Sequence, residues 1–362
     1  MWPFKKKETE ATVLRKLLSI RMEAIGGQGA NSAGKILAET AVLGMGYAGN
    51  HFSSFGSEKR GSPVRSFVRV STENKPVRTA SYIKHPDILV IFHESLLDSH
   101  NEITDGATAS TELIINSKKD PQNIRLPYGL KLKRVTTIDA TTVALKSKCG
   151  LNAVMLAAIV EACPEIKKEK LAQTLTSYFS GLSEIVRKNN LDGFEAAFKY
   201  IKSHRFSEDQ CNREIQTSPL PEMGWINAPI GGVIINPGNS VLKDHSASRK
   251  GYAPLFTKEL CYNCGFCDMV CPDYCFVWDL DPTGAKAPAL QGIDYQYCKG
   301  CQKCVTVCPV SALTLTLESE IPEESKMHRV FSNLNAENIE KQWKKLSLPT
   351  YAEKISKNGD FK

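Results

Sequence analysis

The chain has 362 residues, of which 42% are hydrophobic and 23% are charged, and these fractions exclude a largely disordered protein. The longest apolar runs, 88–92 and 153–160, are much shorter than the ~20 residues that span a bilayer, so we expect no membrane span. Segment 8–16 is polar where a signal peptide has its apolar core, which predicts a cytoplasmic protein.

The formal net charge of +7 makes a nucleic-acid partner worth testing. The basic run 5–7 stands alone, and aromatic and basic residues are not interleaved as base stacking requires. We therefore interpret this run as a solvated tail and expect no nucleic-acid partner.

From residue 19 to residue 205, short β-branched runs alternate with longer helical patterns. The expected strands are 20–25, 64–71, 88–93, 113–116 and 135–138, and the expected helices are 30–43, 152–162, 167–178 and 183–203. This alternation predicts an α/β domain with a largely parallel sheet.

A glycine-rich loop, Gly26-Gly27-Gln28-Gly29, joins the first expected strand to the first expected helix. Such a loop can present backbone N–H groups at the positive end of a helix. The pattern nevertheless matches neither of the common nucleotide-binding motifs, and the next lysine, Lys35, falls inside the helix. A turn for close strand–helix packing, or for a subunit interface, is therefore favoured over a dinucleotide site.

The remaining segments differ in composition. Residues 1–18 form an N-terminal extension ahead of the α/β domain at 19–205. In 206–254 prolines and glycines interrupt every periodic pattern, which predicts an extended connector wrapped over a partner surface. Residues 255–317 form a small cysteine-rich domain, and 318–362 form a charged tail with one expected helix at 335–346.

Twelve cysteines are present, and nine of them fall between Cys261 and Cys308. Cytosolic thiols stay reduced, so this density indicates metal binding rather than disulfides. Two C-x2-C-x2-C-x3-C-P runs begin at Cys261 and Cys298, 37 residues apart. This is the bacterial pattern for two [4Fe-4S] clusters, in which the fourth cysteine of each run binds the other cluster. It assigns one cluster to Cys261, Cys264, Cys267 and Cys308, and the other to Cys298, Cys301, Cys304 and Cys271.

The alternative for these cysteines is a pair of zinc sites, but zinc gives no reason for a third cysteine repeated at x2 spacing. The spacing therefore predicts a small α+β fold like a bacterial two-cluster ferredoxin. An apolar shell that limits water access is expected from Phe266, Met269, Val270, Ile293, Val305, Val307, Val310 and Leu313. Cys275 has Ala312 as its counterpart in the repeat, and we interpret it as a buried inert thiol rather than a ligand or redox sensor. Cys149, Cys163 and Cys211 are isolated and are interpreted as packing residues.

Several motifs resemble subunits of the 2-oxoacid:ferredoxin oxidoreductases. Segments 24–29, 33–39 and 55–61 are similar to the gamma subunit of that family. Segments 231–234 and 237–240, which lead into the cysteine runs, are similar to its delta subunit. The chain thus resembles a fused gamma/delta subunit over residues 20–317.

Two positions depart from the family pattern. Arg60-Gly61-Ser62 stands where Arg-Gly-Gly is usual, and Ser248-Arg249 stands where Trp-Arg is usual. Arg60 either faces a carboxylate, the thiamine site or coenzyme A, or it makes an ordinary interface ion pair. The departures leave the subunit class unchanged and weaken any choice of substrate.

The resemblance also implies a division of labour among several chains. In that family a thiamine diphosphate site, with Mg, lies between separate alpha and beta subunits and cleaves a 2-oxoacid, usually with coenzyme A. The Gly-Asp-Gly thiamine signature is missing from this sequence, so no catalytic residue is expected on this chain. By resemblance, the chain carries electrons to external ferredoxin, its gamma-type domain packs beside the active site near coenzyme A, and the complex is a dimer of protomers.

Pyruvate is the default substrate that the resemblance implies, with oxalate or another 2-oxoacid as the alternative. Two further alternatives remain open for the chain itself. One is an independent ferredoxin-like carrier whose N-terminal domain binds an unrelated partner, and the other is the cluster-bearing subunit of a different redox complex.

Overall fold

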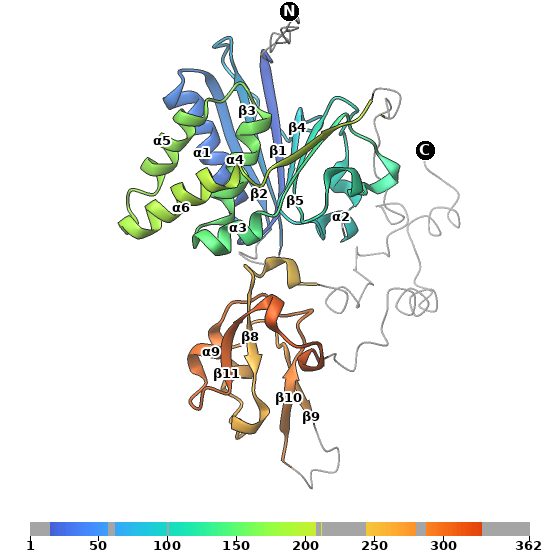
Figure 1. The fold of residues 1–362 in the computed structure, drawn as a ribbon, viewed down its shortest axis with the longest axis vertical. Coiled ribbons are helices and arrows are strands. Elements are labelled where there is room, and N and C mark those ends of the chain that lie inside the picture. The colour runs from blue at the N-terminus through green and yellow to red at the C-terminus, as the bar shows by residue number, and fades with distance from the viewer. Residues whose placement is uncertain are drawn as a thin grey trace, which may run out of the picture. The chain divides into compact units, whose positions relative to one another are not determined.

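The computed structural model describes residues 15–56, 62–99, 101–207, 211, 244–279 and 287–327 (Figure 1). The chain divides into two compact units, Met1–Ser218 and Pro219–Lys362. Arg60, most of the predicted connector and the predicted helix at 335–346 lie outside the described residues. Among the described helices, none combines the length and apolar character that crossing a bilayer requires.

The first unit is built on a seven-stranded sheet with the order β2-β3-β1-β4-β5-β6-β7. Its strands are β1 (Leu17–Ile25), β2 (Ala48–Phe55), β3 (Pro63–Ser71), β4 (Ile88–Ile91), β5 (Glu112–Asn116), β6 (Arg134–Ile138) and β7 (Lys202–Arg205). Strands β1, β4, β5 and β6 run parallel to one another, whereas the pairings that involve β2, β3 and β7 are antiparallel. The predicted α/β class is confirmed.

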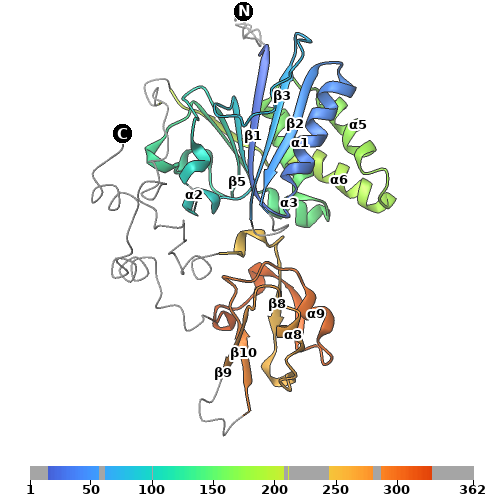
Figure 2. The same cartoon turned by 180° about the vertical axis from the view of Figure 1, so that it is seen from behind.

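Helices cover both faces of this sheet. They are α1 (Ala30–Glu39), α2 (Leu96–Ser99), α3 (Ala140–Ser147), α4 (Leu151–Ala162), α5 (Lys168–Tyr178) and α6 (Glu184–Ala197). Figures 1 and 2 show α1 and α3 to α6 on one side and α2 on the other. The chain moves from β1 through α1 toward the β2 edge, but from β4 through α2 toward the β7 edge. Crossovers between parallel strands are right-handed. Two such connections that run toward opposite edges of the sheet therefore place their helices, α1 and α2, on opposite faces.

The core of this unit lies between the sheet and the larger helical layer. All four residues of β4 are buried, as expected for a parallel strand covered on both faces. Ten of the twelve residues of α4 are buried, so this helix is apolar on every side and packs centrally between β5, β6 and α6.

Some predicted boundaries were wrong. The helix predicted to reach residue 203 ends at Ala197, and the chain continues into β7, which pairs with β6. The helix predicted at 30–43 ends at Glu39 and is followed by a π-helical turn at Thr40–Gly44. Strand β2 and helix α3 were missed, although the Asp139 side chain caps α3 by accepting a hydrogen bond from the Thr142 N–H at 3.1 Å.

The second unit has the predicted small α+β fold. Strand β8 (Tyr252–Phe256) pairs antiparallel with β11 (Leu313–Leu317), and β9 (Phe276–Asp279) pairs antiparallel with β10 (Ala289–Ile293). Two short helices, α8 (Phe266–Met269) and α9 (Lys303–Val307), follow the two cysteine loops. Buried apolar residues of the strands form its core, with Ala253, Phe276, Leu290, Ile293 and Leu313 at its centre.

The packing of α6 gives a testable stability prediction. Phe194 is fully buried, and its ring meets that of Phe198 edge-on with centroids 5.3 Å apart. Phe194→Ala should lower the free energy of unfolding by about 3–5 kcal/mol, because it removes buried surface and leaves a cavity. Denaturant titration of the full chain, followed by far-ultraviolet circular dichroism, measures this change.

The matched control is Ile185→Ala on the same helix. Ile185 is 72% exposed, so its truncation should change stability by no more than about 0.5 kcal/mol. Equal effects of the two substitutions would contradict the packing of α6 described above.

Candidate metal centre

The two cysteine runs share one backbone conformation. Left-handed residues occur at Asn263, Gly265 and Tyr274 in the first half and at Gly300, Gln302 and Ser311 in the second, so each pair is 37 residues apart. Four of these six are not glycine, and such residues rarely adopt a positive φ without a local constraint. The sequence repeat is therefore also a repeat of loop geometry.

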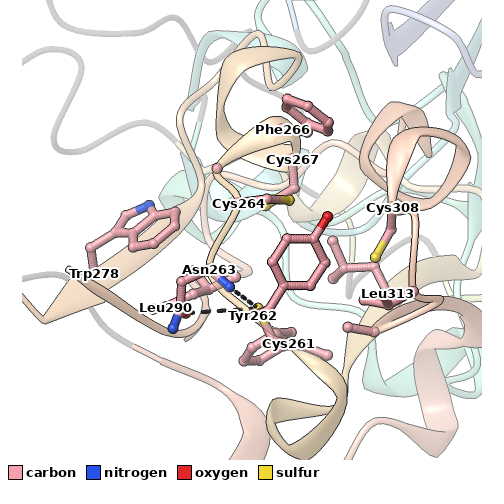
Figure 3. A pocket seen from close by; sticks show the side chains of 14 residues that line it. Cys261, Tyr262, Asn263, Cys264, Phe266, Cys267, Trp278, Leu290, Cys308 and Leu313 are labelled. Carbon is pink, nitrogen blue, oxygen red and sulfur yellow. Dashed lines mark hydrogen bonds between the residues drawn. The ribbon is translucent and has the colours of Figure 1, made fainter. Parts of the chain in front are cut away.

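The eight predicted cysteines line two cavities in two sets of four. The first cavity is lined by Cys261, Cys264, Cys267 and Cys308 (Figure 3). The second cavity is lined by Cys271, Cys298, Cys301 and Cys304. The two cavities are similar in size. In each set the first three cysteines come from one run and the fourth comes from the other.

The donor set suits a cluster of irons better than a single ion. Four of the predicted cysteines line each cavity. A four-iron cubane needs this arrangement, because each of its cysteines binds a different corner.

Burial would keep several of these thiols protonated in the absence of a metal. It raises the pKa of Cys267 to about 11 and the pKa of Cys304 to about 12. Bound iron supplies the positive charge that stabilises a thiolate in such a place. Backbone N–H groups add to this, since those of Asn263 and Cys275 donate to the Sγ atoms of Cys261 and Cys271, each at 3.4 Å. The residues present therefore fit two iron–sulfur clusters.

The surroundings of the two cavities differ. Phe256, Tyr262, Phe266 and Trp278 give the first cavity an aromatic lining. The second cavity is lined in part by Asp273 and Lys299, which form an ion pair at 3.1 Å, and by Lys303. The predicted apolar shell is correct for the buried Ile293 and Leu313.

The shell prediction was wrong for Met269 of α8. Met269 is 81% exposed and lines neither cysteine cavity, whereas Phe266 lines the first cavity although it is 51% exposed. Because α8 is a single turn whose buried position is taken by Cys267, Met269 is left on the outer side. An apolar side chain beside a cysteine run is therefore not sufficient evidence for shielding.

Arg249 is a structural residue of the site whose role the sequence did not reveal. Its guanidinium is nearly buried and donates to the carbonyl oxygens of Tyr295, at 2.6 Å, and Cys298, at 2.8 Å. It also forms an ion pair with Glu318. Arg249 thus ties the start of the second cysteine loop to the end of β11. Its position beside Ser248 at a departure from the family pattern was the only available signal, and it gave no partner.

The glycine-rich loop lies in the first unit and is tightly packed. The Gln28 side chain is buried and accepts a hydrogen bond from the Ile25 N–H at 2.9 Å. Gly29 has a φ of +87°, and a β-carbon there would lie 3.1 Å from Cβ of Asn152 on α4. Both features favour the interpretation of Gly26, Gly27, Gln28 and Gly29 as a packing turn between β1 and α1.

Comparisons with known proteins identify both units. Residues 19–200 match the family described as pyruvate ferredoxin/flavodoxin oxidoreductase, and residues 260–312 match a 4Fe-4S dicluster domain. These two matches on one polypeptide define an oxidoreductase subunit that carries an iron–sulfur domain. The chain belongs to the pyruvate ferredoxin/flavodoxin oxidoreductase family.

Individual relatives agree with this assignment. The chain is 36% identical over 176 residues to the pyruvate/ketoisovalerate oxidoreductases common subunit gamma of Pyrococcus furiosus, covering 48% of this chain and 91% of that protein. It is 33% identical over 169 residues to pyruvate synthase subunit PorC of Thermotoga maritima, covering 46% and 85%. It is 36% identical over 100 residues to subunit PorD of the same organism, covering 28% and 93%. The predicted resemblance to gamma and delta subunits is confirmed.

The role of Arg249 leads to a second prediction. Arg249→Lys keeps the positive charge but cannot donate to two carbonyls and a carboxylate at once. We expect it to destabilise the second unit by about 2–4 kcal/mol, because buried carbonyl oxygens lose their donors. The check is the rate at which bound iron is released to a chelator during mild denaturation, which should rise.

Arg187→Lys on α6 of the first unit is the control, and it should leave iron release unchanged. If the Arg249→Lys variant released iron at the wild-type rate, this result would show that the guanidinium does not hold the second cysteine loop.

Proposed function

We propose that this chain is the electron-transfer subunit, with gamma-type and delta-type parts joined, of a thiamine diphosphate-dependent 2-oxoacid:ferredoxin oxidoreductase. The observation that carries the proposal is the division of eight cysteines into two cavities of four. Family membership of residues 19–200 supports the enzyme class. We propose functional boundaries at 19–205 for the gamma-type domain and 255–317 for the cluster domain.

In this proposal one [4Fe-4S] cluster is held by Cys261, Cys264, Cys267 and Cys308, and the other by Cys298, Cys301, Cys304 and Cys271. The bound clusters supply one-electron transfer at low potential. The protein's own contribution is to hold the thiolates, to donate backbone N–H groups to their sulfurs and to limit water around them. The exchange of the fourth cysteine between the runs keeps the two cavities at a fixed separation.

The partners follow from the division of labour in the family. We propose that separate alpha and beta subunits bind thiamine diphosphate and Mg and cleave the 2-oxoacid with coenzyme A. The present chain receives the electrons and passes them to an external ferredoxin, in a complex that is a dimer of protomers. The loop at 26–29 serves packing or a subunit contact, and Arg60 contributes to an interface or to the site of coenzyme A.

Pyruvate is the proposed substrate, because the relatives from Thermotoga maritima are named for pyruvate synthase. A branched 2-oxoacid is the second candidate, and one observation favours it. The relative from Pyrococcus furiosus is named as a subunit common to pyruvate and ketoisovalerate oxidoreductases. A gamma-type subunit of this family is therefore compatible with more than one substrate-cleaving partner.

Anaerobic purification of the tagged chain from its own cells tests this proposal. The expected result is co-elution with two thiamine-enzyme chains and reduction of a ferredoxin that depends on a 2-oxoacid and coenzyme A. Pyruvate, ketoisovalerate and oxalate are then compared as substrates. A monomer that exchanges electrons with unrelated partners would instead identify an independent carrier.

Cys264→Ser is the third prediction. Cys264 is one of the four thiols of the first cavity, so its loss should remove about half of the roughly eight irons that two cubanes contain. The assembled complex should lose ferredoxin reduction, while the first unit keeps its far-ultraviolet circular dichroism. Iron analysis of the purified variant provides the measurement.

Cys211→Ser removes a thiol that lies outside both cavities, and it should retain full iron content and activity. Full iron content in Cys264→Ser would contradict the proposed ligand set.

A further inference from the structure

The two cavities differ by one sulfur atom. The second cavity is lined by a fifth cysteine, Cys275, in addition to its four proposed ligands. The residue 37 positions later is Ala312, which lines the first cavity at the corresponding place. Both residues are buried, at 3% and 2% exposure. The module is thus symmetric in its proposed ligands but asymmetric in this neighbouring side chain.

Cys275 is held in place on several sides. Its backbone N–H donates to Cys271 Sγ at 3.4 Å, and its carbonyl oxygen accepts a hydrogen bond from the Asp294 N–H at 2.8 Å. Its side chain hydrogen-bonds to the sulfurs of both Cys271 and Cys298. The thiol therefore lies between two proposed ligands that come from different cysteine runs.

The direction of these hydrogen bonds can be inferred from the charges involved. A cysteine that binds iron does so as a thiolate, so the sulfurs of Cys271 and Cys298 have no proton to donate when the cavity holds a cluster. Cys275 lies outside the proposed ligand set and is 3% exposed, so it remains a neutral thiol with an S–H group. Cys275 is thus the S–H donor, and the two ligand sulfurs are the acceptors.

An S–H group that donates a hydrogen bond to a ligand sulfur changes the free energy of adding an electron to the cluster. Reduction of a cluster adds one negative charge, part of which is carried by the ligand sulfurs, and hydrogen bonds to these sulfurs tune the reduction potential. A hydrogen bond strengthens as its acceptor becomes more negative, so the donor stabilises the reduced form. The nearby Asp273 and Lys299 carry opposite charges in one ion pair and largely offset each other.

We propose that Cys275 is a positioning residue that orients the sulfurs of Cys271 and Cys298 and raises the reduction potential of the cluster in the second cavity. The inference rests on the proposed function, since it requires that cavity to hold a cluster. Its consequence is that an electron within the module resides more often at the second cavity than it does without this thiol. The proposal differs from the sequence-based interpretation of Cys275 as an inert thiol.

Cys275→Ala tests the proposal, because alanine is the residue that the first cavity already has. We expect the full iron content of about eight per chain and a lower potential for one cluster only. The distribution of one electron between the clusters should change about tenfold, which corresponds to about 59 mV for a one-electron couple. The measurement is a redox titration of the anaerobic full chain, monitored by electron paramagnetic resonance.

Two further variants keep the test decisive. Cys275→Ser retains an O–H donor and should shift the potential less than Cys275→Ala. Cys149→Ala removes a thiol from the first unit and should leave both potentials at their wild-type values.

Three results have distinct meanings. Unchanged potentials in Cys275→Ala at full iron content would overturn the proposal. Loss of iron from that variant would also overturn it, since Cys275 would then be a ligand. Wild-type protein that cannot be loaded with iron and sulfide would instead contradict the proposed function itself.

Discussion

The structure of the second unit depends on one constraint, which is that each set of four sulfurs must be completed by the opposite cysteine run. Cys271 lies in the cavity of the second run and Cys308 in that of the first. Neither run therefore supplies four sulfurs to a cavity by itself. The repeated left-handed residues occur in both halves, and the halves are joined in one small fold in which β8 pairs with β11 and β9 pairs with β10.

The first unit is organised by packing between its sheet and its helices. Its glycine loop is closed by Gln28 and pressed against Asn152, so the backbone there serves the junction of β1, α1 and α4. The family match covers this whole domain at 19–200. The chain thus combines an α/β domain with a small module in which eight cysteines line two cavities. In the proposed complex, carbon chemistry and electron transfer are carried out by different polypeptides.

The sequence predicted most where the determinants are local. Cysteine spacing predicted the two groups of four that line the cavities, because the repeat in sequence is also a repeat of loop geometry. Strand β7 was missed because Lys202–Arg205 has no alternating apolar pattern and is stabilised by its pairing with β6. Arg249 could not be understood from the sequence because Cys298 and Glu318 are 49 and 69 positions away. The contact of Cys275 with two sulfurs likewise depends on how the two runs fold against each other.

The iron and inorganic sulfide content of the anaerobically prepared wild-type chain tests the central claim most directly. Two cubanes held by two sets of four cysteines predict about eight irons and about eight sulfides per chain, without stoichiometric zinc. Zinc in place of iron, or only about four irons per chain when loading is complete, would contradict the account.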